Sequence, residues 1–346
     1  MGLLSRIGKL TRHLPLLPTS PTAMKSVALP DLFAHAEPCL ARFEGVEIPV
    51  HYKRGSNKTL IVLFHGAVDQ KLRPRPFFQP HFTQTMGAHQ LAISDPSLAR
   101  SDELKAAWFL GDQDLPLATL LPAFFAAVTQ AGGFERVIYF GASAGGHAAL
   151  HYSNRHAGSL ALAVNPQINL NNYLPAAIDA YRTHCWTGLA GNDELDERVQ
   201  MDAGLLYGEG MGNSVCILNS SGDRFHLFKQ TFPFVARIPP TAQNRFVLHC
   251  DYYGIKGHSG SIPPQACLPW LKAAVLAPNL YADSLLVKFA QVKAPAAPAP
   301  AAAAPAAAAA PVRTPAAPAP VGFSADDIRM ADAIRQWQLS SAGPNA

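Results

Sequence analysis

The segment Gly141-Ala142-Ser143-Ala144-Gly145-Gly146 limits the fold of this chain more than any other segment. An apolar run at 137–140 comes directly before it, and a run of helical composition at 148–152 follows shortly after it. A serine with small neighbours at such a junction is typical of a sharp strand-to-helix turn, because strand and helix come close there and leave no room for larger side chains. The sequence therefore predicts a strand, a turn with Ser143 at its tip, and a helix.

From about residue 40, the chain alternates short apolar runs with longer segments of helical period. This alternation is typical of strand-helix units and a mainly parallel sheet. We expect a hairpin at 41–52, strands at 59–64, 90–94, 136–140, 160–164, 214–218 and 245–249, and helices at 115–130, 145–152 and 264–276. The predicted fold class is α/β, with a doubly wound, mainly parallel sheet.

About fifty residues separate the predicted strands at 160–164 and 214–218. A connection of this length is too long for a simple crossover and commonly forms a lid or cap. It contains two pieces of helical pattern, so we expect a helical cap insertion at about 168–212. Trp186 and Tyr207 within it are predicted to contact the substrate. The alternative is a surface excursion with a small core of its own.

The two ends of the chain differ from its middle. Residues 1–39 are predicted to be an N-terminal extension, and residues 40–292 to be the folded domain. Residues 293–322 are rich in proline and alanine, which offer little apolar surface to bury, so we expect a disordered linker. At 323–346 we expect a short amphipathic helix and a tail, and this helix would need a docking surface on this protein or on a protein partner. The alternative is a disordered end with an accidental apolar stripe.

Composition and charge exclude several classes of protein. The chain has 346 residues, of which 49% are hydrophobic, so it can bury a substantial core. Its formal net charge is +4 without a basic stripe, which argues against a nucleic-acid partner. Five singly spaced cysteines argue against a disulfide framework and favour a reducing, cytoplasmic location. We find no transmembrane run, no nucleotide-binding glycine motif and no metal motif, so no cofactor and no metal are expected.

A serine nucleophile needs a positioned base, and the base needs an acid to orient it. Asp223 follows one predicted strand, and His258 lies in a glycine-rich loop after the next. Parallel strands end at the same edge of a sheet, so Ser143, Asp223 and His258 are predicted to meet there as nucleophile, acid and base. Asp251, which begins the loop that carries His258, is the alternative acid.

Two other histidines lie close to these residues in the sequence. His147 is on the predicted helix after Ser143, and His226 is at the start of a short helix after Asp223. The position of His147 favours a packing or hydrogen-bonding role over the role of the base. His226 could compete with His258 as the base, but its place at the start of a helix favours a structural role.

The order serine, aspartate, histidine on successive strand ends resembles the α/β-hydrolase superfamily, over about residues 40–277. The resemblance implies an oxyanion hole formed by the backbone amides of Ala67 and Ala144, with the His65-Gly66 pair organising the first of these loops. The segments Ser94-Asp95-Pro96 and Trp108-Phe109-Leu110-Gly111 are also similar to bacterial hydrolase-like proteins encoded with capsule and surface-glycan systems.

These inferences predict a serine hydrolase that cleaves a carboxylic ester or related acyl bond through an acyl-Ser143 intermediate, which water activated by His258 resolves. One alternative is an acyltransferase that passes the acyl group to a glycan or another alcohol. Another is a non-catalytic hydrolase-like scaffold that recruits a partner through its C-terminal helix. The expected partner of the site is therefore a small-molecule or glycan acyl substrate.

Overall fold

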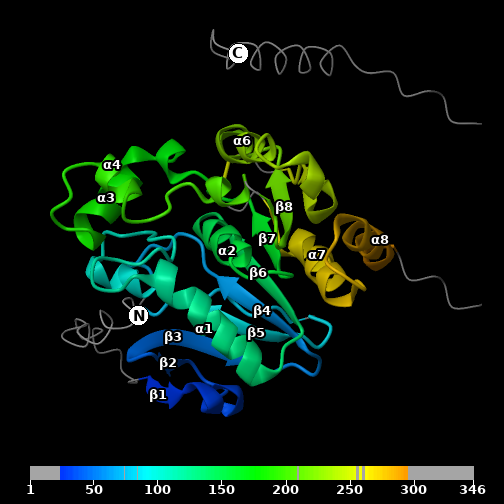
Figure 1. Cartoon of the computed structure of the whole chain (residues 1–346), viewed down its shortest axis with the longest axis horizontal. Coiled ribbons are helices and arrows are strands. Elements are labelled where there is room, and N and C mark those ends of the chain that lie inside the picture. The colour runs from blue at the N-terminus through cyan, green and yellow to red at the C-terminus, as the bar shows by residue number, and fades with distance from the viewer. Residues whose placement is uncertain are drawn as a thin grey trace, which may run out of the picture. The chain divides into compact units, whose positions relative to one another are not determined.

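The computed structural model describes residues 24–73, 75–83, 85–208, 210–254, 257–258 and 262–294. Within them, a nine-stranded sheet has the order β1-β2-β3-β5-β4-β6-β7-β8-β9, with helices on both faces (Figure 1). All pairs from β5 through β4 to β9 are parallel, whereas both pairs of β3 are antiparallel. This confirms the predicted α/β class with a mainly parallel sheet.

The strands and helices have the following bounds. The strands are β1 Lys25–Ala28, β2 Cys39–Phe43, β3 Val46–Lys53, β4 Thr59–Phe64, β5 His89–Ile93, β6 Arg136–Ala142, β7 Leu160–Val164, β8 Ser214–Ser220 and β9 Phe246–Asp251. The helices are α1 Leu117–Gly132, α2 Ala144–Asn154, α3 Pro175–Cys185, α4 Asn192–Asp196, α5 Arg224–His226, α6 Phe232–Val235, α7 Pro264–Leu276 and α8 Ala282–Lys293, with a π-helical turn at Leu227–Thr231 between α5 and α6.

Every predicted strand and domain helix is present, but β1 and α8 were not expected. β1 lies inside the predicted N-terminal extension and pairs in parallel with β2, so the sheet begins before residue 40. α8 packs on α7, where the rings of Phe289 and Trp270 stack with centroids 3.9 Å apart. The predicted linker beyond residue 294 and the predicted helix at 323–346 lie outside the described residues.

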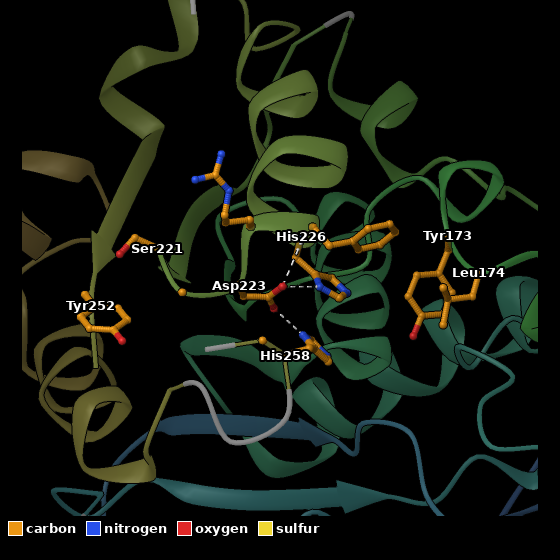
Figure 2. Close-up of a pocket in the computed structure, with 11 residues that line it drawn as sticks. Tyr173, Leu174, Ser221, Asp223, His226, Tyr252 and His258 are labelled. Carbon is orange, nitrogen blue, oxygen red and sulfur yellow. Dashed lines mark hydrogen bonds and ion pairs between the residues drawn. The ribbon is translucent and has the colours of Figure 1, made fainter. Parts of the chain in front are cut away.

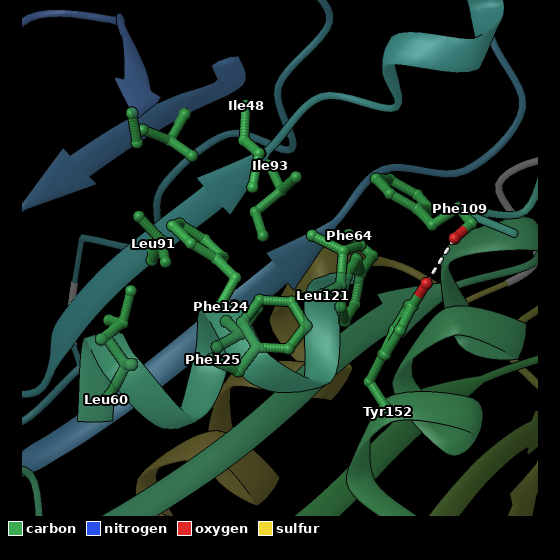
Figure 3. Close-up of a cluster of buried hydrophobic side chains, with 14 of the residues drawn as sticks. Ile48, Leu60, Phe64, Leu91, Ile93, Phe109, Leu121, Phe124, Phe125 and Tyr152 are labelled. Atoms are coloured by element: carbon green, nitrogen blue, oxygen red, sulfur yellow. Dashed lines mark hydrogen bonds between the residues drawn. The ribbon is translucent and has the colours of Figure 1, made fainter. Parts of the chain in front are cut away.

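β4 shows why the sheet is covered on both faces. Its residues Leu60, Val62 and Phe64 belong to an apolar cluster with α1 and α2, whereas Ile61 and Leu63 belong to a cluster with α7. Figure 3 shows the first cluster, in which the α1 phenylalanines lie beside β4. Successive side chains of a strand point to opposite faces, so a continuous apolar run requires packing partners on both.

The order in which strands are added to the sheet changes side at β4. β5 pairs with one edge of β4, and β6 pairs with the other. In open α/β sheets, the carboxyl ends of strands beside such a reversal border the ligand-binding crevice. The residues that follow β4 and β6 therefore lie where a site is expected.

The insertion between β7 and β8 is helical, as expected, and has two parts. α3 and α4 pack with the loop that contains Trp108. The turn Ala203–Tyr207 packs instead against α2 and α6, where Tyr207 contacts Phe234 edge to face. No helix in the described part of the chain is long and apolar enough to cross a bilayer.

Candidate active site

Ser143 lies at the junction of β6 and α2, with φ 56° and ψ −116°, a conformation that residues other than glycine rarely adopt. The glycines around it are required because the backbone is crowded. A Cβ atom on Gly145 would lie 2.5 Å from the carbonyl oxygen of Phe64, and one on Gly141 would lie 2.1 Å from the carbonyl oxygen of Gly145. The small residues therefore let α2 begin against the end of β4, with Ser143 at the carboxyl edge of the sheet.

The three residues predicted to act together meet at this edge. The Oγ atom of Ser143 lies 2.7 Å from Nε2 of His258, and Nδ1 of His258 lies 2.5 Å from Oδ2 of Asp223. Figure 2 shows the ring of His258 directed at the Asp223 carboxylate. Asp223 is buried at the end of β8, where it caps α5. His258 is half-buried, in the loop after β9.

The charge of Asp223 determines where the protons lie. Burial acts to raise the pKa of this carboxyl group, but hydrogen bonds from His226 and His258 outweigh burial and hold the pKa well below its ordinary value. An ionised carboxylate only accepts hydrogen bonds, so Nδ1 of His258 must carry a proton. Nε2, when it carries no proton, is then an acceptor, and the Ser143 hydroxyl donates to it.

A second imidazole, that of His226, binds the same carboxylate. Nδ1 of His226 lies 2.9 Å from Oδ1 of Asp223, and its ring stacks on that of His258 with centroids 3.8 Å apart. Burial lowers the pKa of His226, so the ring is neutral and donates from Nδ1. Sequence reasoning assigned His226 a structural role and missed this contact, although its spacing of three residues from Asp223 on a helix was a signal.

The alternative acid, Asp251, lies at the exposed end of β9. Its Oδ1 accepts a hydrogen bond from the backbone N–H of Tyr252 at 2.8 Å. Of the two carboxylates, Asp223 is the one that contacts His258.

The two amides predicted to form an oxyanion hole border Ser143. Ala144 is the first residue of α2. The chain before Ala67 passes close to the serine, since a Cβ on Gly66 would lie 3.7 Å from Cβ of Ser143. Neither the Ala67 nor the Ala144 N–H donates a hydrogen bond within the described part of the chain. Both N–H groups are therefore free to donate to a ligand.

His65 fixes the loop that carries Ala67. Its Nδ1 donates to the carbonyl oxygen of Gly66 at 2.7 Å, and its Nε2 accepts from the backbone N–H of Asp95 at 3.1 Å. Burial lowers the pKa of His65 to about 4, so the ring is neutral, with its proton on Nδ1. These contacts agree with the expected organising role of His65.

Sequence reasoning did not find Gln167, which lies just after β7. Its Nε2 is 2.8 Å from Oγ of Ser143, and the side chain is buried. Its position after a strand end was the available signal. A glutamine is not part of the serine, aspartate and histidine pattern, so nothing marked it as a contact of the serine.

The order of the strands and of the site residues is characteristic of one fold. A sheet that reverses direction at β4, a serine turn after β6, a carboxylate after β8 and an imidazole after β9 form the arrangement of the α/β-hydrolases. This chain has the α/β-hydrolase fold.

Comparison with known proteins gives structural likenesses. No protein-family model and no curated protein sequence matches the chain. Similar solved structures include the capsule O-acetyltransferase of Neisseria meningitidis serogroup A, at 13% identity, 68% of this chain, 96% of that chain and a TM-score of 0.48. Porphyromonas gingivalis dipeptidyl peptidase 4 is similar at 17% identity, over 65% of this chain and 32% of that chain, with a TM-score of 0.44. An S-formylglutathione hydrolase from Agrobacterium tumefaciens is similar at 15% identity, over 72% of this chain and 91% of that chain, with a TM-score of 0.43. The chain thus spans about a third of the dipeptidyl peptidase.

An open cleft of about 710 Å³ lies beside His258 and Asp223 in this α/β-hydrolase fold. Tyr173 and Leu174, from the insertion, lie along its wall with Tyr252, from the loop after β9 (Figure 2). Tyr252 and Leu174 are more than half exposed, at 54% and 53%. The cleft therefore offers apolar surface to a ligand next to the imidazole.

The two aromatic residues predicted to contact the substrate do not line this cleft. Tyr207 is fully buried, and its hydroxyl donates to the carbonyl oxygen of Leu150 at 2.7 Å. Trp186 packs against the cluster that contains Trp108. The expectation for both residues does not hold for this cleft, because their part of the insertion packs on the domain and the stretch at Tyr173 faces the cleft instead.

One group of described residues has the donor atoms of a metal site. Asp223, His226 and His258 each offer a ligand atom, and these atoms lie within 4.8 Å of one another. The Nδ1 atoms of both rings already hydrogen bond to the carboxylate. These hydrogen bonds account for the close approach of the three side chains.

Proposed function

We propose that this protein is a serine hydrolase that cleaves a carboxylic ester or related acyl bond through an acyl-Ser143 intermediate. The observation that carries the proposal is the hydrogen-bonded series of Ser143 Oγ, the His258 ring and the Asp223 carboxylate, with distances of 2.7 Å and 2.5 Å. This is the geometry required for a base to take the proton of a serine hydroxyl.

Each residue has a separate role in the proposed acylation. Oγ of Ser143 attacks the acyl carbon while its proton moves to Nε2 of His258, and Asp223 orients and stabilises the ring as it gains charge. The N–H groups of Ala67 and Ala144 stabilise the oxyanion, aided by the positive end of the α2 dipole. The leaving alcohol then takes the proton from His258.

The acyl group then passes from Ser143 to water that His258 activates. A second candidate acceptor is an alcohol, such as a glycan hydroxyl, because the open cleft has room for a group larger than water. Tyr173, Leu174 and Tyr252 would contact the substrate in either case. A cytoplasmic location and a protein partner at the C-terminal end remain predictions.

Labelling with a fluorophosphonate probe tests the proposal. We expect the probe to label the wild-type protein at Ser143 and not to label Ser143→Ala. Hydrolysis of p-nitrophenyl esters should fall by a factor on the order of 10⁴ to 10⁶ in Ser143→Ala and in His258→Ala. Ser284→Ala, on α8, is the matched control and should retain full labelling. Full ester hydrolysis by purified Ser143→Ala would refute the assignment, and esters of graded chain length would define the acyl group.

A further inference from the structure

The backbone of Gln167 is tied to the serine turn. Its N–H donates to the carbonyl oxygen of Ser143 at 3.1 Å, and its carbonyl oxygen accepts from Nδ1 of His147 at 3.0 Å. The approach depends on Gly146, since a Cβ there would lie 2.9 Å from Cβ of Pro166. The second glycine of the Gly145-Gly146 pair therefore explains how Gln167 reaches the serine.

The side-chain amide of Gln167 has only one consistent orientation. Nε1 of Trp108 lies 2.5 Å from Oε1 of Gln167, and an indole N–H is a donor only. The amide oxygen must therefore face Trp108. The amide nitrogen must then face Ser143, whose Oγ lies 2.8 Å away.

Trp108 is itself held by a constrained loop. Trp108 and Phe109 both have left-handed backbone conformations, with φ of 52° and 58°. The N–H of Phe109 donates to Oδ2 of Asp95 at 2.7 Å, and its carbonyl oxygen accepts from the Tyr152 hydroxyl. Non-glycine residues keep such conformations only where surrounding contacts fix them. The indole N–H therefore has a defined position.

These contacts form a series in which all donors point the same way. Trp108 donates to Gln167, Gln167 to Ser143, Ser143 to His258, and His258 to Asp223. The first group is only a donor, and the last, an ionised carboxylate, is only an acceptor. Neither end can reverse, and hydrogen bonds in such a series strengthen one another.

We propose that Gln167 is a further catalytic residue that promotes release of the acyl group from Ser143, with Trp108 as its positioning residue. This inference rests on the proposed function. A serine hydroxyl oxygen is a good hydrogen-bond acceptor, whereas the same atom in an acyl ester is a poor one. The Gln167 amide therefore stabilises the free serine relative to the acyl-serine.

The chemistry of the release step follows from this difference. Water attacks the acyl carbon, and its proton moves to Nε2 of His258. When the tetrahedral intermediate collapses, the bond between the acyl carbon and Oγ breaks, and the electron pair remains on Oγ. Oγ takes the proton from His258 while the Gln167 N–H donates to it. Acylation begins with that hydrogen bond already formed, so the amide lowers the barrier of release more than that of acylation.

The experiment follows p-nitrophenyl acetate hydrolysis by Gln167→Met. We expect steady-state turnover to fall about tenfold, the effect of losing one hydrogen bond. The initial burst of p-nitrophenol should keep its rate, and mass spectrometry of the intact protein should detect acetyl-enzyme. Trp108→Phe should show a smaller change in the same direction, and the double variant should be no slower than Gln167→Met.

Two variants control for structural damage. Gln90→Met removes a buried amide that bonds to both the N–H and the carbonyl oxygen of Phe82, at 2.8 Å and 2.9 Å, near the start of β5. Trp270→Phe removes a buried indole N–H that has no hydrogen-bond partner in the described structure. Neither variant should accumulate acetyl-enzyme.

The outcomes separate this inference from the proposed function. Failure of the fluorophosphonate to label wild-type Ser143 would overturn both. A labelled wild type with unchanged acetyl release in Gln167→Met would overturn the inference alone, as would equal slowing of acylation and release. If Gln167→Met does not fold, Trp108→Phe decides, and its failure to accumulate acetyl-enzyme would overturn the inference.

Discussion

The turn that carries Ser143 and the loop that carries His258 are held in place in different ways. At the serine turn, backbone atoms approach so closely that a single extra methyl group on Gly141 or Gly145 would collide with a main-chain carbonyl group. In the histidine loop, a methyl group added to Gly254 or Gly257 would meet no atom of the described residues within 4 Å, so only the positive φ of these two glycines, and not a neighbouring atom, would oppose it. Steric contact therefore fixes the nucleophile, and it does not fix the base.

Hydrogen bonds and ring stacking hold His258 instead. Its two nitrogens bond to Ser143 and Asp223, its ring stacks on His226, and the neighbouring Gly257 N–H donates to the carbonyl oxygen of Gly222 at 2.9 Å. Substitutions on the serine side should therefore damage folding, whereas substitutions on the histidine side should damage the rate. Four predictions test this contrast.

Of these four variants, Asp223→Asn should have the largest effect on the rate, although a smaller one than loss of Ser143 or His258. The Asn amide would no longer supply an ionised acceptor to Nδ1 of His258, so the ring would lose the tautomer that accepts the serine proton. We expect kcat/KM for an ester to fall by on the order of 10⁴, in a variant that still folds. Asp251→Asn should be close to wild type. A silent Asp223→Asn and a damaging Asp251→Asn would assign the acid to Asp251.

Gly145→Ala should damage folding. The new Cβ would lie 2.5 Å and 2.7 Å from the carbonyl oxygens of Phe64 and His65, and main-chain atoms cannot move away as a flexible side chain can. We expect a loss of about 3 kcal/mol in the free energy of unfolding, measured with urea. Gly212→Ala, whose nearest atom lies at 3.8 Å, should be close to neutral. Equal stability of the two variants would contradict steric control of the turn.

His151→Leu, on the helix that follows Ser143, should make the free energy of unfolding less sensitive to low pH. His151 is buried on α2 with no hydrogen-bond partner for either ring nitrogen among the described residues, and burial, with Arg155 and His147, lowers its pKa well below 6.5. The unfolded chain binds a proton more readily, so this residue's contribution to stability is lost as the pH falls below 6.5. Between pH 7 and pH 5, wild type should lose about 2 kcal/mol more than His151→Leu. If urea denaturation shows that wild type and His151→Leu lose the same stability between pH 7 and pH 5, this prediction is wrong.

His226→Leu should have the smallest effect. The Asp223 carboxylate would lose the imidazole donor at Oδ1 and keep only the longer bond from the backbone N–H of residue 226, at 3.3 Å. The carboxylate would then be held less firmly against His258, so we expect kcat to fall about tenfold. His226→Asn places a donor near the position of Nδ1 and should recover most of the activity. The two variants should be compared at equal folded fraction, measured by circular dichroism. If the leucine and asparagine variants are equally impaired, stacking matters more than the donor.

Local patterns allowed most of the sheet to be predicted. The predicted strands at 59–64 and 160–164 agree with the observed bounds. All of their residues are buried, and nearly all are apolar, so the sequence pattern marks both ends clearly. β1 is only four residues long, and its pairing with β2 is a tertiary contact, so no local signal identified it. α8 gains its packing from α7 in the same way.

The site was predictable only in part for a related reason. Ser143, Asp223 and His258 follow strand ends in an order that sequence displays. Gln167 depends on an amide orientation set by Trp108, a residue 59 positions away. Trp186 and Tyr207 were expected to contact the substrate but do not line the cleft, because composition does not report which side of an insertion packs on the domain. Hydrogen-bond partners that lie far apart in the sequence, such as Gln167 and Trp108, are not encoded in local patterns.

The left-handed residues concentrate backbone strain around the site. Six described residues other than glycine have positive φ, and Trp108, Phe109, Ser143 and Asn165 are the four that lie around the site. Each costs about 1 to 2 kcal/mol that neighbouring contacts must offset. As denaturant or heat weakens those contacts, these turns should relax first. Ester hydrolysis should therefore disappear before the far-UV circular dichroism signal changes, so the protein becomes inactive while most of its secondary structure persists.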